Sequence, residues 1–189
     1  MSSFRSILAK PFASFVVQNR RKWEQRAVET QLSLMKSLIS EASHTLFGKD
    51  HRFSQISDYQ SFKDSVKVQD YENLKPYIEK VVAGEPDILW KDKPLYFAKT
   101  SGTTSGVKYI PISKESIGFH INGARDALLS YVHETGKAKF LDKNLMFLSG
   151  SPEMEKKNGI FTGRLSGIVN HHVPTYLRSN QMFLYLNSR

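Results

Sequence analysis

Thr100-Ser-Gly-Thr-Thr-Ser-Gly-Val-Lys-Tyr-Ile-Pro111 is the stretch that decides the fold, because it places hydroxyl side chains and two glycines between two short apolar runs. The runs Leu95–Ala98 and Tyr109–Ile112 predict strands, so the residues between them form a loop at a strand end, where α/β sheets usually bind ligands. Glycines let the backbone approach an anion closely, and successive N–H groups can then surround it. The loop therefore predicts a phosphate-binding site.

Phosphate contacts are expected from the loop residues that carry a hydroxyl group, a flexible backbone or a positive charge. They are Thr100, Ser101, Gly102, Thr103, Thr104, Ser105, Gly106 and Lys108. A Walker A loop is excluded, because Gly102 and Gly106 are separated by three residues instead of four and Lys108 is followed by tyrosine. A Ser/Thr/Gly-rich surface hairpin without a ligand has the same composition, and spacing alone does not separate the two interpretations.

The sequence around the loop, from Pro94 to Ser113, resembles the signature loop of the adenylate-forming superfamily, which wraps the pyrophosphate end of ATP. It is most similar to the bacterial form of the auxin-responsive-promoter family of acyl acid amido synthetases. The similarity includes Phe47–His51, Asp70–Tyr77 and Gly163–Val169. The resemblance implies an α/β fold that corresponds to the N-terminal part of the adenylate-forming fold.

Two parts of the N-terminal domain are expected. Residues 1–93 would form a helical lead-in, and residues 94–189 would begin a mixed sheet in the nucleotide- and acyl-binding portion. Members of the family are several hundred residues long and carry further motifs for adenine, ribose and metal, followed by a mobile C-terminal domain. These motifs are not found in the 189 residues, so we expect a truncated N-terminal portion that turns over poorly by itself.

The implied reaction joins a carboxylic acid to an amino acid with ATP and Mg²⁺. An acyl-adenylate would form first, and the amino acid would then attack the acyl carbon to give an amide and AMP. Ser101, Thr103 and Thr104 are the favoured phosphate contacts, no catalytic residue is assigned, and the Mg²⁺ ligand is expected outside this chain. An acyl-CoA ligase with the same loop and a non-catalytic nucleotide-binding module are the alternatives.

Apolar periodicity and capping residues predict the helices. Val28, Leu32, Met35, Ile39, Ala42 and Leu46 recur at steps of three and four, which predicts a buried helical stripe with Gly48 as its end. A second helix follows the cap Asp58, and a third starts near Pro76 and ends at Gly84. Ser113 is expected to cap a helix from about Lys114 to Glu134 that ends at Gly136, and Leu145–Leu148 predicts a short buried strand.

Three residues of the predicted helix after the loop are candidate substrate contacts. Arg125 could pair with a carboxylate, and Phe119 and Ala124 belong to a pattern of bulky and small residues that an acyl pocket would show. A surface arginine and an ordinary packing face explain the same residues. His171 and His172 are neighbours, which on a strand would point to opposite faces, so no metal site is expected there.

Composition indicates an enzyme domain of the cytoplasm. Apolar residues make up 40% of the chain, enough for a core, and without cysteine neither a disulfide nor a thiolate metal site is possible. About half of the net charge of +9 comes from residues 1–26, where six basic residues stand against Glu24. A transit peptide, a nucleic-acid-binding helix and a membrane-surface helix share this composition, but a basic solvated face is favoured. We therefore expect no nucleic-acid or membrane partner.

Overall fold

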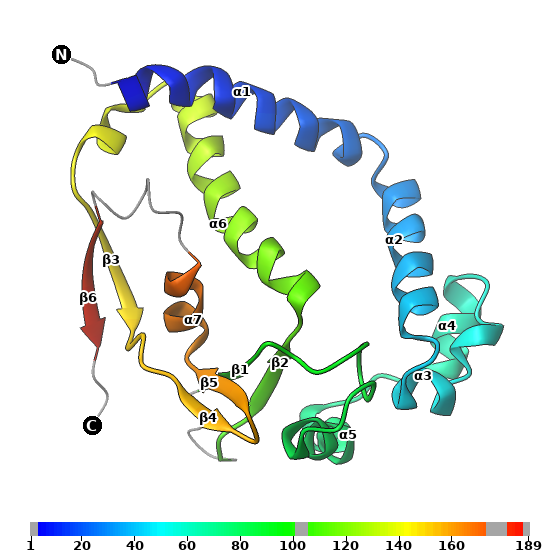
Figure 1. The fold of residues 1–189 in the computed structure, drawn as a ribbon. Coiled ribbons are helices and arrows are strands. Elements are labelled where there is room, and N and C mark those ends of the chain that lie inside the picture. Colours follow the sequence, from blue (N-terminus) through cyan, green and yellow to red (C-terminus); the bar gives the residue numbers. More distant parts are fainter. Residues whose placement is uncertain (1–3, 101–105, 173–180, 187–189) are drawn as a thin grey trace. The chain divides into compact units, whose positions relative to one another are not determined.

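The computed structural model describes residues 4–100, 106–172 and 181–186. The chain divides into two compact units. The first unit is made of residues 1–25, 115–154 and 163–189. The second unit is made of residues 26–114 and 155–162. Figure 1 shows the elements in chain order. The predicted division into domains at residue 93 stays a prediction.

Helices open the second unit. They are α2 (Ala27–Ala42), α3 (Leu46–Asp50), the 3-10 helix η1 (Phe53–Gln55), α4 (Tyr59–Ser65) and α5 (Tyr71–Ala83). Ile39, Ala42 and Phe53 form a buried cluster, against which Phe47 and Trp90 pack. The cluster joins the end of α2 to η1, so the helices share one small core instead of standing alone.

The helix predicted to continue to Gly48 ends at Ala42, because Thr45 starts a new one. The Thr45 hydroxyl donates to the Ala42 carbonyl at 2.7 Å and accepts the Gly48 N–H at 3.0 Å, which caps α3. A Cβ on Gly48 would lie 2.1 Å from the Ala42 oxygen, so this glycine permits a close turn instead of ending a helix. The predicted stripe is also only partly buried, since Val28 is 73% exposed.

The next two helices begin at acidic caps. Asp58 accepts the Ser61 N–H at 2.8 Å and caps α4 as predicted, and its hydrogen bonds with Ser61 lower the pKa of Asp58. The prediction that the following helix starts near Pro76 is wrong. Asp70 accepts the Asn73 N–H at 2.9 Å, so α5 begins one turn earlier and holds Pro76 in its interior. Gly84 ends α5 with a left-handed φ of 92°.

A four-stranded sheet completes the second unit, in the order β2-β1-β5-β4. Its strands are β1 (Tyr96–Lys99), β2 (Tyr109–Ile112), β4 (Glu155–Lys157) and β5 (Ile160–Gly163). The pairs β1/β2 and β4/β5 are antiparallel. Phe97 is fully buried and clusters with Val81, Ile88 and Ile160, which packs the sheet against α5. Both strands predicted to flank the Ser/Thr/Gly loop are therefore confirmed.

Two long helices dominate the first unit. They are α1 (Phe4–Glu24) and α6 (Lys114–Thr135), with the 3-10 helix η2 (Lys139–Asp142) after them (Figure 1). Ala9 and Ala13 of α1 pack against Leu129 and Val132 of α6. Arg20 adds a hydrogen bond of 2.7 Å to the Ser130 hydroxyl. The prediction for α6 is confirmed, including its end before Gly136.

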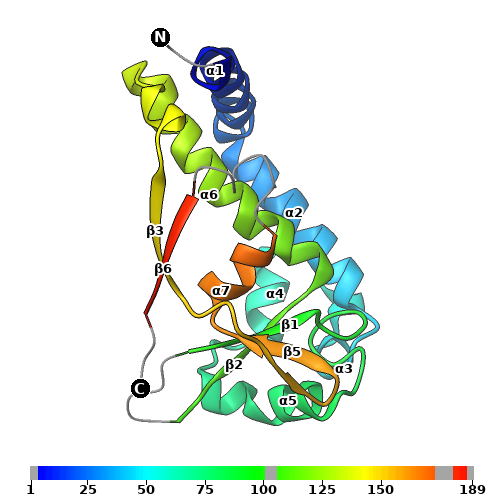
Figure 2. The ribbon, with the colours of Figure 1, turned by 60° about the vertical axis from the view of Figure 1, so that its left-hand side comes forward.

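The rest of the first unit is a parallel pair of strands and a short helix. They are β3 (Leu145–Gly150), β6 (Gln181–Leu186) and α7 (Leu165–His171), and Figure 2 shows the two strands side by side. The strand predicted at Leu145–Leu148 is confirmed, although Met146 is 62% exposed and not buried. A Cβ on Gly167 would lie 2.3 Å from the Ser151 oxygen, so α7 packs closely on the chain that leaves β3.

Among the helices that the structure describes, none combines the length and the apolar character needed to cross a bilayer.

Replacing Thr45 with alanine should destabilise the second unit by about 1–2 kcal/mol, because both hydrogen bonds of a buried cap are lost. Chemical denaturation of T45A followed by circular dichroism measures the change. T45S keeps the hydroxyl and should retain most of the stability. Equal losses in T45A and T45S would show that the methyl group, and not the cap, matters at this position.

Candidate functional site

The β1/β2 hairpin holds the two ends of the candidate phosphate loop. Lys99 pairs with Tyr109 at the end of the ladder, and the Thr100 N–H donates to the Lys108 carbonyl at 3.1 Å one step further. Thr100, Gly106 and Lys108 are therefore brought together at the mouth of the loop. The predicted phosphate contacts between them, Ser101, Gly102, Thr103, Thr104 and Ser105, lie outside the described residues.

Gly106 has a backbone conformation that only glycine adopts readily. Its φ is 80°, in the left-handed region, where a side chain would introduce strain. Among the described residues other than its chain neighbours, no heavy atom lies within 4 Å of the position that a Cβ would occupy. The left-handed backbone of Gly106 is therefore compatible with a turn of the kind that presents N–H groups to an anion.

Tyr71 binds the hairpin to the start of α5 through two contacts. Its hydroxyl accepts the Tyr109 N–H at 2.9 Å, and the Lys108 ammonium lies 5.1 Å from the centre of its ring. A cation at this distance from an aromatic face is attracted by about 0.5–2 kcal/mol, depending on how well water is excluded. Because Asp70 caps α5 one residue earlier, the position of Tyr71 is set by the helix start. Tyr71 therefore orients the lysine that follows the loop.

Two further lysines lie near the hairpin. The Lys157 ammonium donates to the Tyr109 hydroxyl at 3.0 Å and lies 4.2 Å from the centre of the same ring. Lys99 pairs with Glu155, whose pKa is lowered first by the hydrogen bond from Lys99 and then by its charge. Lys99 is thereby committed to an ion pair, whereas Lys108 and Lys157 both rest on aromatic rings beside β2.

Sequence reasoning from composition missed Tyr71 and Lys157. Tyr71 lies in the stretch Asp70–Tyr77 that carried part of the family resemblance. The resemblance thus pointed to this segment, but it did not assign a function to Tyr71. No local sequence pattern pointed to Lys157 as part of the site, because 48 residues separate it from Tyr109 and only the sheet brings the two side chains together.

The candidate substrate contacts lie in α6 of the first unit but do not share a face. Arg125 is half-buried, whereas Phe119 and Ala124 are exposed. The Arg125 guanidinium pairs with Asp126 at 2.8 Å. Both residues border a cavity of about 330 Å³ in the first unit, whose other lining residues are Phe12, Phe15, Val16, Asn19, Arg20 and Trp23. Aromatic side chains of α1 thus face a guanidinium of α6.

The adjacent histidines lie at the end of a helix and not on a strand, as the sequence argument assumed. His171 is the last residue of α7, and His172 is its C-cap. The His171 Nε2 atom lies 2.8 Å from the Pro152 carbonyl, which fits a structural role. Within the described part of the chain, no group of three or more His, Asp or Glu side chains is arranged to hold a metal ion.

Comparison with known proteins gives one matching family model, the GH3 family N-terminal domain, over residues 17–184. Among curated proteins, the chain is 32% identical over 154 residues to the indole-3-acetic acid-amido synthetase GH3.15 of Arabidopsis thaliana, an alignment of 80% of this chain and 24% of that protein. It is 41% identical over 103 residues to a probable indole-3-acetic acid-amido synthetase, GH3.13 of Oryza sativa subsp. japonica, covering 53% and 21%. The chain thus spans about a quarter of the length of the curated relatives it matches.

Solved structures show the same fold. A structure described as the AtGH3.15 acyl acid amido synthetase in complex with 2,4-DB matches 82% of this chain and 26% of its own, with a TM-score of 0.67 and 20% identity. A second GH3.15 acyl acid amido synthetase structure has a TM-score of 0.64 and 23% identity, covering 75% and 26%. The mixed α/β fold expected from the sequence is therefore confirmed as the fold of this part of the synthetases.

Substituting Tyr71 should free the mouth of the loop in two separable steps. Y71F removes the acceptor of the Tyr109 N–H but keeps the ring beneath Lys108, and Y71A removes both. Loss of one such hydrogen bond costs about 1 kcal/mol, so amide hydrogen exchange at Tyr109 should accelerate about fivefold in Y71F. Y59F, which removes a hydroxyl from an exposed tyrosine, serves as the control. Unchanged exchange in Y71F would mean that the hydrogen bond does not hold the hairpin.

Proposed function

The chain belongs to the GH3 family, through the N-terminal domain that residues 17–184 match, and we propose that its loop Thr100–Lys108 binds the phosphates of ATP for the synthesis of acyl acid amides. The observation that carries this proposal is the hairpin, which joins Thr100 to Lys108 and has the left-handed Gly106 two residues before that lysine. Curated relatives of the chain are named as an indole-3-acetic acid-amido synthetase and a jasmonoyl–L-amino acid synthetase. The bacterial source implied by the resemblance stays a prediction.

The chemistry of the loop suits a phosphate ligand. Backbone N–H groups near a left-handed glycine present partial positive charge, and Ser101, Thr103 and Thr104 would add hydroxyl donors. Lys108 adds a full charge whose direction is fixed by the Tyr71 ring. Donors that are held in place before the reaction stabilise the charge that develops on the leaving pyrophosphate without further rearrangement. The loop thus favours breakage of the bond between the α- and β-phosphates.

In the proposed reaction a carboxylate oxygen attacks the α-phosphorus of ATP, and pyrophosphate leaves. The amine of an amino acid then attacks the acyl carbon, AMP leaves with the bonding electron pair, and the amine loses a proton. Mg²⁺ would neutralise phosphate charge during the first step. No residue of this chain is assigned to Mg²⁺, and none is assigned as a catalytic base.

We also propose the α1/α6 cavity as the binding site of the carboxylic acid. Its lining carries Arg20 and Arg125, with Asp126 as the partner of Arg125 in the unliganded chain. A carboxylate that takes the place of Asp126 would receive two parallel hydrogen bonds from Arg125, while Phe12 and Trp23 offer apolar surface to the rest of the acid. Phe119 and Ala124 are exposed and do not line this cavity. A cytoplasmic location, where ATP and amino acids are abundant, belongs to the same proposal.

ATP should raise the melting temperature of the 189-residue chain, because a ligand that binds only the folded state stabilises it. Removing two hydroxyl donors in S101A/T104A should weaken ATP binding at least tenfold, since hydrogen bonds to charged groups contribute about 1.5–3 kcal/mol each. T30A/S33A removes one threonine and one serine hydroxyl from exposed positions of α2 and should bind ATP normally. Titration calorimetry measures the affinities. Unchanged ATP affinity in S101A/T104A would contradict the phosphate site.

Assays of turnover distinguish the proposed amido synthetase from an acyl-CoA ligase and from a non-catalytic nucleotide-binding module. Pyrophosphate exchange into ATP that depends on indole-3-acetic acid, jasmonic acid or 2,4-DB indicates adenylation of an acid. Transfer of the acyl group to an amino acid supports the synthetase, and transfer to coenzyme A supports the ligase. ATP binding without exchange would mark the 189 residues as a nucleotide-binding part only.

Replacing Arg125 should weaken the binding of the carboxylic acid. R125Q removes the charge and should raise the Kd roughly tenfold or more, because a charged hydrogen bond is lost, whereas R125K keeps the charge and should bind with intermediate affinity. Ligand-observed NMR with 2,4-DB measures the Kd. R26Q, at an exposed arginine paired with Glu29, is the matched control. Equal affinity in R125Q and the unchanged chain would place the acid elsewhere.

A further inference from the structure

The first helix, α1, has a narrow buried face made of small residues. Ser6, Ala9, Ala13 and Val17 recur at steps of three and four and are all buried. Ala9 and Ala13 contribute to the core that α1 shares with α6. This face and hydrogen bonds such as that from Arg20 to Ser130 hold α1 in its unit, and the opposite side of the helix is left for solvent or a partner.

That opposite side is apolar instead of polar. Its large side chains are 47–74% exposed and lie at helical steps of one, three and four; we call them the apolar stripe: Phe4, Ile7, Leu8, Phe12 and Phe15. A solvated face would carry charged or polar groups at these positions. Three exposed phenylalanines on one helix face form a contiguous apolar surface, which marks an interaction site. The sequence-based expectation of a basic solvated face is therefore incomplete.

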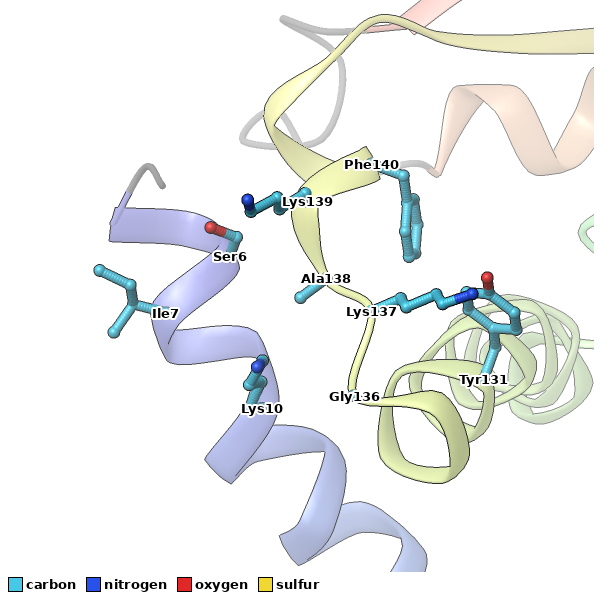
Figure 3. Close-up of a pocket in the computed structure, with 9 residues that line it drawn as sticks. All are labelled: Ser6, Ile7, Lys10, Tyr131, Gly136, Lys137, Ala138, Lys139 and Phe140. Carbon is cyan, nitrogen blue, oxygen red and sulfur yellow. The ribbon is translucent and has the colours of Figure 1, made fainter. Parts of the chain in front are cut away.

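A cavity of about 710 Å³ lies beside the first turns of α1. We call it the basic groove, and the lining residues that matter here are Ser6, Lys10, Tyr131, Lys137, Lys139 and Phe140. Tyr131 and Phe140 meet edge to face at 5.8 Å and give it an apolar wall. In Figure 3, Lys10 and Lys139 project into the space between α1 and residues 136–140. None of its lining residues is acidic, so the groove is strongly positive.

The charged residues of α1 before Glu24 are all positive, like those that line the basic groove. Arg5 and Lys10 flank the apolar stripe, Arg20, Arg21 and Lys22 follow it, and Glu24 is the first acidic residue of the sequence. The stripe also lies before residue 17, where the match to the family model begins. It is therefore outside the residues that the family model matches.

We propose that the apolar stripe and the basic groove dock the chain on the surface of an anionic lipid bilayer. Helices that lie in the bilayer interface bury phenylalanine and leucine at the acyl boundary, while lysine and arginine reach the anionic headgroups beside them. The structure supplies both parts on adjacent surfaces of one unit, from α1 and from residues 136–140. The cytoplasmic leaflet of membranes is anionic, which fits the proposed location of the enzyme.

The charge pattern is the reason for choosing a lipid surface over other partners. A second copy of this chain would bring the Arg5 and Lys10 that flank its own apolar stripe against those of the first copy, and these like charges would repel each other. An acidic protein would satisfy the lysines, but nothing in the stripe provides the polar contacts that a protein partner of this kind needs at its rim. A bilayer satisfies both the exposed aromatic side chains and the surplus positive charge.

Vesicle flotation tests the proposal directly. The 189-residue chain should float with vesicles of phosphatidylcholine containing 30 mol% phosphatidylserine, and much less with phosphatidylcholine alone, at roughly 0.1 M salt. K137Q/K139Q should weaken the binding at least tenfold, because each lysine near an anionic surface contributes about fivefold. F4Q/L8Q should weaken it by a similar factor through loss of apolar burial. These substitutions change exposed side chains only, and they avoid Phe12 and Phe15, which border the proposed acid site.

Matched controls lie in the second unit. K36Q/K67Q removes two exposed lysines, and V68Q removes an apolar side chain that is fully exposed, so both should float like the unchanged chain. Failure of the unchanged chain to float, equal binding to both vesicle types, or equal losses in K36Q/K67Q and K137Q/K139Q would each overturn the proposal. Concentration-dependent dimerisation that is lost in F4Q/L8Q, without vesicle binding, would instead assign the stripe to a second copy and also overturn it.

Discussion

Antiparallel pairing of β1 with β2 is the constraint on which the candidate phosphate site depends. The pairing holds Thr100 and Lys108 within one hydrogen bond, so the residues between them must return over a short distance. Phe97 of β1 holds the hairpin against α5 through its complete burial. Tyr71 holds β2 by accepting the Tyr109 N–H. The described ends of the loop, Thr100 and Lys108, are thus held in place, and stabilisation of a developing charge requires groups that are positioned before the reaction.

Aromatic rings give the hairpin a second property, because they orient cations without neutralising them. Lys108 lies over Tyr71 and Lys157 lies over Tyr109, whereas Lys99 is committed to Glu155. A carboxylate partner would cancel the charge that an anionic ligand needs. An aromatic face holds the ammonium in place and leaves its charge available to a ligand. Tyr71 and Tyr109 thus each hold one lysine beside β2.

In the first unit, helix α1 has two apolar faces, a buried one made of small residues and an exposed one made of large residues. Small residues on the inner face of α1 permit close approach to α6, so most of the large apolar side chains must lie on the outer face or at its margins. Part of that outer face borders the proposed acid cavity, and part lies beside the basic groove. A single helix can thus serve a ligand site along one stretch and an interaction surface along another.

Residue patterns by themselves determined the two strands of the hairpin, α6 and the α/β class, because strands, caps and glycine turns are local and each leaves a signal within a few residues. Local signals failed where a tertiary contact overrode them. Thr45 divides the predicted long helix because residues 87 and 88 accept the first N–H groups of α3, and Asp70 starts α5 a turn before Pro76. Only the tertiary structure placed Lys157 on Tyr109 and gathered lysines from α1 and residues 136–140 around one groove, since these residues are far apart in the sequence and no local pattern links them.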